Sequence, residues 1–196
     1  MSAVNNLNLV SINDYLAHEL ESPLKHEFIG GHVYRLVDFT NRHNIIAGNL
    51  LGALYACLRG GPYRAFDSQA RIRIRLPSQS RVYYPDCSVV GRQNPLDDFF
   101  QDDPVIIFEV IAPSTRRTDE VEKRDAYLTI PSLSVYAIVE QKSAQVVLYR
   151  RTETGFVAEV YEGLNAVIPL LEIDAELALT DVFADVDFQP DPADDQ

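Results

Sequence analysis

Apolar residues recur at helical spacing in three segments of the chain. The longest segment covers 43–58, where most apolar positions are four residues apart. A short helix is predicted from Ser11, which can cap it. Another is predicted at 119–130, with Asp119 as its cap and Pro131 as its stop. The longest helix is expected to bury Ile46, Leu50, Leu54 and Leu58, in a stripe widened by Ile45, Leu51 and Tyr55.

Other apolar residues alternate with polar ones or form continuous runs, which is typical of strands. Two alternating runs about Gly30-Gly31 predict a hairpin at 25–38, because both glycines tolerate positive φ. The segment 71–76 places its apolar residues on one face and three arginines on the other. The nearly continuous apolar run 105–111 is typical of a central strand. Further strands are predicted at 81–90, 133–140, 145–151 and 156–162, and a polar loop at 93–103.

These elements predict an α/β (α+β) fold with a mixed central sheet flanked by helices, preceded by an N-terminal helix and a β-hairpin. The length of 196 residues suits a single domain. We expect this domain to cover residues 1–184, and the acidic residues 185–196 to form a mobile tail.

The composition favours a soluble globular protein, since 46% of the residues are apolar and 23% are charged. No apolar stretch approaches the roughly 18–20 residues that span a bilayer, and no signal-peptide pattern is recognisable. These features predict a cytoplasmic protein with no membrane partner. Cys57 and Cys87 form no Cys-x-x-Cys motif, so we expect both to be reduced core residues.

The acidic charge is concentrated in the last quarter of the sequence. The net charge is −12, and residues 151–196 hold 12 acidic side chains against one basic side chain, Arg151. Residues 1–150 are nearly neutral, with 17 acidic and 16 basic side chains. A neutral body can present a local basic surface, so the total charge does not exclude a phosphate-bearing substrate.

Two carboxylates lie at or within apolar strands and are the first candidates for chemistry. Asp86 follows Pro85 at the head of one strand, and Glu109 interrupts the run 105–111. Burying an unpaired charge would cost several kcal/mol. A Mg²⁺ ion bound between the carboxylates would offset that cost, because Mg²⁺ favours oxygen ligands. Alternatively, Glu109 forms a structural ion pair with an arginine at 71, 73 or 75.

Lys123 is the third candidate. It lies early in the helix that follows the Glu109 strand, and the first turns of such a helix return to the end of the strand. A lysine there could orient an attacking water or neutralise charge on a scissile phosphate. The alternative is that Lys123 is an ordinary exposed helix lysine.

Four segments together resemble one protein family. They are Tyr84-Pro85-Asp86, residues 108–115 (FEVIAPST), residues 119–127 with Lys123, and residues 133–140 (LSVYAIVE). In this order they resemble the Uma-two family, formerly domain of unknown function 820, of the restriction-endonuclease-like PD-(D/E)xK superfamily. The resemblance extends from Tyr15 to Tyr161 and includes Glu27 and His43.

The resemblance implies a restriction-endonuclease-like core. Its sheet would contain the strands at 71–77, 82–90, 105–111 and 133–140. Asp86 and Glu109 would be the metal ligands, and the backbone carbonyl of Val110 would be a further ligand. The implied cofactor is Mg²⁺ or Mn²⁺.

The resemblance also implies catalytic roles for Lys123, Glu27 and His43. Ile111 stands where the superfamily has its lysine, and this family places its lysine in the following helix, which matches Lys123. Glu27 matches an acidic position that would complete the metal site, and His43 matches a position on the substrate side. The alternative for Glu27 is a surface carboxylate beside a turn. The alternative for His43 is an ordinary polar residue at a helix start. The sequence departs from the family pattern at Ala112 and Ala137, and these departures affect the expected substrate contacts more than the expected chemistry.

The residues predict metal-assisted phosphodiester hydrolysis, and the resemblance implies that the enzyme is a DNA endonuclease. A homodimer is expected, because cutting two strands needs two sites. The spacing of Arg71, Arg73 and Arg75 is close to that of successive phosphates, so they could track a DNA backbone, or they could pair with the acidic C-terminal segment. That acidic segment could also cover a basic surface as an autoinhibitor. The alternative functions are a non-catalytic binding or scaffold protein and a small-phosphoester hydrolase.

Overall fold

The computed structural model describes residues 9–36, 39–91, 97–111 and 118–188, with the backbone alone at 118–120. The helical elements are α1 (Ile12–Glu21), α2 (Asn41–Cys57), the π-helical η1 (Thr118–Lys123), α3 (Arg124–Tyr127), the 3-10 turn η2 (Leu171–Ile173) and α4 (Leu179–Val182). A six-stranded sheet has the order β11 (Gly155–Glu162), β10 (Gln145–Thr152), β9 (Val135–Glu140), β8 (Pro104–Ile111), β6 (Cys87–Gly91) and β3 (Tyr63–Asp67). A five-stranded sheet has the order β2 (His32–Arg35), β1 (His26–Ile29), β5 (Ser80–Tyr83), β4 (Arg71–Arg75) and β7 (Phe100–Gln101). β12 (Val167–Leu170) and β13 (Ala175–Ala178) pair with each other.

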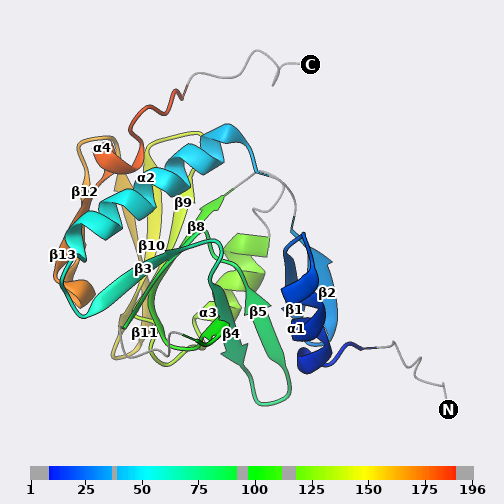
Figure 1. Ribbon diagram of the computed structural model, residues 1–196. Coiled ribbons are helices and arrows are strands. Elements are labelled where there is room, and N and C mark those ends of the chain that lie inside the picture. Colours follow the sequence, from blue (N-terminus) through cyan, green and yellow to red (C-terminus); the bar gives the residue numbers. More distant parts are fainter. Residues whose placement is uncertain (1–8, 37–38, 92–96, 112–117, 189–196) are drawn as a thin grey trace.

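The six-stranded sheet is mixed, because β8 and β9 run parallel while its other neighbouring strands are antiparallel. Figure 1 shows α2 along one face of this sheet, with the N-terminal elements α1, β1 and β2 on the side of the molecule away from β12 and β13. This arrangement confirms the predicted mixed α and β fold.

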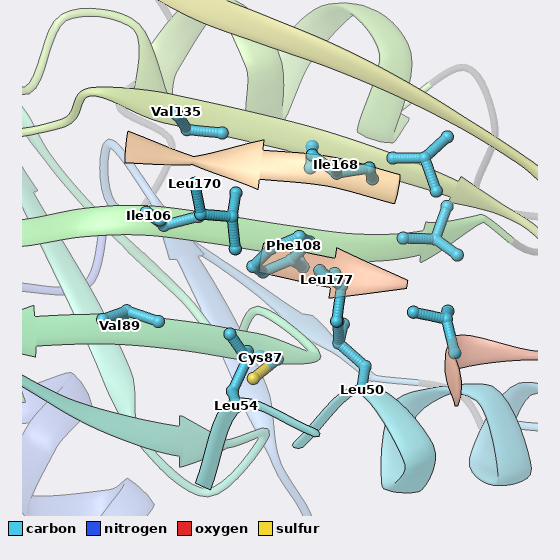
Figure 2. Packing of buried hydrophobic residues seen from close by; sticks show 14 of the residues in the cluster. Leu50, Leu54, Cys87, Val89, Ile106, Phe108, Val135, Ile168, Leu170 and Leu177 are labelled. Atoms are coloured by element: carbon cyan, nitrogen blue, oxygen red, sulfur yellow. The ribbon is translucent and has the colours of Figure 1, made fainter. Parts of the chain in front are cut away.

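The main core lies between α2 and the six-stranded sheet. Figure 2 shows Leu50 and Leu54 of α2 in one cluster with Cys87 and Phe108 of the sheet and Leu177 of β13. All of these side chains are buried, which removes their apolar surface from water. The predicted stripe of α2 is thus confirmed at its centre. Its predicted margin is wrong in part, since Ile45 is 40% exposed and Tyr55 is 54% exposed.

The opposite face of β8 packs against a second cluster. Ile107 and Ile111 alternate with the residues that face α2, and they pack with Tyr127 of α3. The buried side chains of β4, Ile72 and Ile74, belong to the same cluster. β8 is therefore covered on both faces, as its continuous apolar run predicts.

The strand predicted at 81–90 is two strands in two different sheets. β5 ends at Tyr83 in the five-stranded sheet, and β6 begins at Cys87 in the six-stranded sheet. The segment Tyr84-Pro85-Asp86 crosses between them, and Pro85 has no N–H to offer to a ladder. The expected core sheet is corrected accordingly, because the strand at 71–77 is β4 and lies beside β5.

The helix predicted at 119–130 is shorter and irregular. It consists of η1 followed by α3, which ends at Tyr127, ahead of Pro131. The side chain of the expected cap, Asp119, lies outside the described residues. The expected loop at 93–103 contains β7, whose two residues pair in parallel with β4. The elements between 167 and 182 had no counterpart in the predicted pattern.

Several local predictions are confirmed. The Ser11 hydroxyl accepts a hydrogen bond from the Asp14 N–H at 3.1 Å at the start of α1. Gly30 and Gly31 have φ of 57° and 99° in the hairpin between β1 and β2. Cys87 is buried as expected, but both cysteines were predicted to be core residues and Cys57 is exposed.

The chain beyond α4 stays on the main core as far as the structure describes it. Val186 and Phe188 pack against the α2 cluster, and the Phe188 ring lies 5.4 Å from that of Phe183, edge to face. Residues 189–196 of the predicted tail lie outside the described residues. Within the described ranges, no helix combines the length and the apolar character needed to cross a membrane.

Candidate active site

Asp86 and Glu109 lie where β6 and β8 stop pairing. Cys87 is opposite Phe108 in the register, so Asp86 and Glu109 follow immediately beyond this pair. The Val110 N–H donates a hydrogen bond of 2.8 Å to Asp86 Oδ2. Asp86 is 6% exposed and Glu109 is 3% exposed. The fold therefore brings both predicted carboxylates to the same end of two adjacent strands, and buries them.

His43 approaches Asp86 from the first turn of α2. The Thr40 side chain caps this helix by accepting from the His43 N–H at 3.3 Å. His43 Nε2 lies 3.2 Å from Asp86 Oδ2, and the imidazole stacks on Phe39 with ring centroids 4.0 Å apart. An ionised carboxylate only accepts hydrogen bonds, so Nε2 carries the hydrogen. His43 Nδ1 is buried and has no hydrogen-bond partner among the described residues.

Lys123 joins two carboxylates on the other side of the site. Its Nζ lies 2.9 Å from Glu27 Oε1 in β1 and 3.5 Å from Glu109 Oε1 in β8. The three residues are each exposed by 6% or less. Lys123 is therefore not an exposed helix lysine, and Glu27 is not a surface carboxylate. Among the described residues, Glu109 pairs with Lys123, and the predicted alternative of an ion pair with an arginine at 71, 73 or 75 is wrong, because those arginines bond Tyr84 and Asp102.

Two tyrosines that the sequence analysis missed lie beside this ion pair, Tyr127 at Glu109 and Tyr83 at Lys123. The Tyr127 hydroxyl donates to Glu109 Oε1 at 3.2 Å, and the Tyr83 ring lies 5.7 Å below Lys123 Nζ. Burial raises the pKa of Tyr127 well above its usual range, and the nearby charges of Glu109 and Glu27 raise it further. Burial also raises the pKa of Tyr83 to about 12. Tyr127 lies four positions after Lys123, a helical spacing that could have identified it.

The arginines of β4 are engaged within the protein. Arg73 donates two hydrogen bonds to the Asp102 carboxylate, at 2.7 and 2.5 Å, and Arg75 donates a third at 2.9 Å. Arg71 Nε donates to the Tyr84 hydroxyl at 2.5 Å. The expected pairing with the acidic C-terminal segment is therefore wrong for the described residues. Asp102, just ahead of β8, pairs with Arg73 and Arg75 instead.

The donor set fits a hard divalent cation better than zinc. Among the described residues, no group of three His, Cys, Asp or Glu side chains is placed to hold a metal ion. Mg²⁺ binds through one or two carboxylates and completes its shell with waters, so Asp86 and Glu109 suffice for it. A strand residue points its N–H and C=O to the same side, so the Val110 carbonyl is directed toward the Asp86 side of β8.

Comparisons with known proteins bear on the fold and on the family of the chain. The fold is similar to that of a crystal structure from Anabaena variabilis, described as a "putative nuclease belonging to DUF820", with a TM-score of 0.69 and 17% identity over 89% of this chain and 98% of that one. Two proteins of Synechocystis sp. are similar in sequence. Uncharacterized protein sll1609 is 27% identical over 154 residues (77% of this chain, 86% of that protein), and uncharacterized protein slr1290 is 26% identical over 147 residues (74% and 76%). The model of the family Uma2, described as "Putative restriction endonuclease", matches residues 12–181, and the chain belongs to this family.

Proposed function

We propose that the protein is an endonuclease that hydrolyses phosphodiester bonds of DNA with Mg²⁺ or Mn²⁺. One observation carries the proposal: two buried carboxylates lie at the same end of adjacent strands, Asp86 just before β6 and Glu109 near the end of β8, and the buried Lys123 Nζ lies 3.5 Å from Glu109 Oε1. Membership of the Uma2 family supports a nuclease-like function. We also propose that two copies act together, because cleavage of both DNA strands needs two sites.

Asp86, Glu109 and the Val110 carbonyl would hold the ion. When bound, the ion lowers the pKa of a coordinated water and offsets the charge that develops on the phosphate. The protein's own residues would supply a positive charge and hold the reacting groups in position. Lys123 supplies a fixed positive charge where the scissile phosphate would lie, and Glu27 holds the lysine in place. His43 fixes the orientation of the Asp86 carboxylate through its Nε2 contact.

Metal binding is the first test. Mn²⁺ and Mg²⁺ are titrated calorimetrically into the wild type, Asp86→Asn and Glu109→Gln, with circular dichroism to confirm folding. Glu172→Gln is the matched control, because it neutralises a carboxylate that pairs with Arg150 at the β10–β11 edge of the sheet. Saturable binding in the wild type and the control, and its loss in both site variants, is expected. Absence of binding in the wild type would favour the scaffold alternative.

Cleavage is the second test. Supercoiled and linear duplex DNA are incubated with each protein and Mg²⁺ or Mn²⁺, and p-nitrophenyl phosphate esters serve as small substrates. Lys123→Met should lower the cleavage rate by about a hundredfold or more, since a fixed charge near the reacting phosphate is worth that much. Full DNA cleavage by folded Asp86→Asn would refute the assigned site. Hydrolysis of the small esters alone would favour the small-phosphoester alternative.

A further inference from the structure

We infer that Glu19, a residue of α1 outside the site, is a positioning residue that ties the two halves of the site together. Its carboxylate is only 6% exposed and accepts three hydrogen bonds. The donors belong to His26, which precedes Glu27, and to Tyr84, which lies two residues before Asp86. A role for Glu19 in catalysis rests on the proposed function, whereas the hydrogen bonds of Glu19 are independent of it.

One arm of the network runs to Asp86. The Tyr84 hydroxyl donates to Glu19 Oε1 at 2.7 Å and accepts from Arg71 Nε at 2.5 Å. Lys25 and Arg71 each place their charged group 5.6 Å from the centre of the Tyr84 ring. Tyr84 belongs to the segment that crosses between the two sheets, outside both ladders. Its anchored side chain is therefore what fixes the approach of the chain to Asp86.

The other arm runs to Lys123. The His26 N–H donates to Glu19 Oε1 at 2.8 Å, and His26 Nδ1 lies 2.9 Å from Oε2. Since a carboxylate only accepts, His26 Nδ1 carries the hydrogen. The next residue, Glu27, holds Lys123 Nζ at 2.9 Å. A single carboxylate thus fixes the segment that orients the metal ligand Asp86 and the segment that holds the lysine.

Attachment of α1 alone does not require a buried charge. Tyr15 packs on Phe28 with ring centroids 5.1 Å apart, and both belong to an apolar cluster that anchors the helix. A buried carboxylate costs free energy that its hydrogen bonds must offset. Among the described residues, all three donors to Glu19 come from the two segments that carry site residues. This pattern is typical of a residue that does not contact the metal itself but orients the residues that bind it.

The test compares three variants. Glu19→Gln keeps one acceptor oxygen for three donors, and Tyr84→Phe removes only the arm to Asp86. Glu172→Gln is the control. The readout is hydrogen exchange of the Val110 amide, which bonds Asp86, measured by NMR against amides of β9 and β10 in the same protein. We expect exchange at Val110 to rise about tenfold in Glu19→Gln and Tyr84→Phe, the effect of losing one ordinary hydrogen bond, with the reference amides and the control unchanged.

A second readout is the Kd for Mn²⁺, which should rise about tenfold or more in both variants. Val110 exchange equal to the wild type in folded Tyr84→Phe would overturn the inference, as would a uniform rise across all amides in both variants. Absence of Mn²⁺ binding in the wild type would refute the proposed function but leave the exchange test decisive for the network. If Glu19→Gln fails to fold, Tyr84→Phe still decides, because it keeps the Glu19 carboxylate and its bonds to His26.

Discussion

Lys123 shares one ammonium group between two buried carboxylates, Glu27 and Glu109. Each of these groups would be costly to bury alone, and together they are stable because their charges and hydrogen bonds compensate. Tyr127 adds a neutral donor to the same Glu109 oxygen. At the scale of single residues, the site therefore consists of charges that depend on one another. Removing one should affect stability as well as activity.

Lys123→Met should destabilise the fold by about 3–5 kcal/mol, because it leaves two buried carboxylates without their cation. Adding Glu27→Gln should recover part of that loss, since it removes one of the two buried carboxylates that contact the Lys123 ammonium in the wild type. Urea unfolding of the wild type, both single variants and the double variant measures the coupling. Additive losses in the double variant would contradict the assigned ion pair.

The two cysteines should differ sharply in reactivity. Cys87 is fully buried, and burial, followed by the charges of Asp86 and Asp67, raises the pKa of its thiol well above the usual range. Cys57 is exposed, although partial burial raises the pKa of its thiol too. Ellman's reagent at pH 8 should label one thiol in the native protein and two in urea. Cys57→Ser should abolish the native reaction; rapid labelling of that variant would show that Cys87 is accessible.

Local sequence patterns predicted several individual elements. α2, the hairpin about Gly30-Gly31 and the buried strand β8 were all recognisable, because each pattern reports one local environment. The break between β5 and β6 was not, since the apolar residues on either side of Pro85 read as one continuous strand although they serve two sheets. The same limit explains Ile45 and Tyr55, whose apolar character matches the α2 stripe while their positions face water.

The centre and the margin of the α2 stripe offer a direct comparison of a buried and an exposed position. Leu50→Ala should cost about 2–5 kcal/mol of unfolding free energy, because Leu50 is fully buried against the sheet. Tyr55→Ala should change it by less than about 0.5 kcal/mol, since exposed positions away from special features are tolerant. Urea unfolding with equal m-values would measure both. A cost at Tyr55 comparable to that at Leu50 would place Tyr55 in an interface that the isolated chain does not show.

At the scale of the whole molecule, the sequence predicted which residues come together at the candidate site better than it predicted their partners. Five separate segments bring the predicted residues to one end of the sheets; these residues are Asp86, Glu109, Lys123, Glu27 and His43. Partners such as Asp102 for the β4 arginines depend on which strands become neighbours, and local periodicity does not determine that. Glu19 was missed for the same reason, because its role exists only after α1, β1 and the Tyr84 segment have met.

The uneven charge of the chain leads to a prediction about DNA binding. Residues 189–196 carry Asp191, Asp194 and Asp195, whose charge would oppose a DNA backbone or cover a basic surface. Deleting these residues leaves Phe188 on the core, so the change removes charge without removing the described packing. We expect the deletion, and the full-length Asp→Asn triple variant, to tighten binding of duplex DNA at low salt.

The advantage should shrink as salt rises, because the screening length falls from roughly 30 Å at 0.01 M to about 8 Å at 0.15 M. Fluorescence anisotropy of a labelled duplex across this range, with EDTA to prevent cleavage, measures the effect. Equal affinity of the three proteins at 0.01 M salt would exclude an autoinhibitory role for the acidic end. Tighter binding by the deletion but not by the triple variant would assign the effect to the peptide itself and not to its charge.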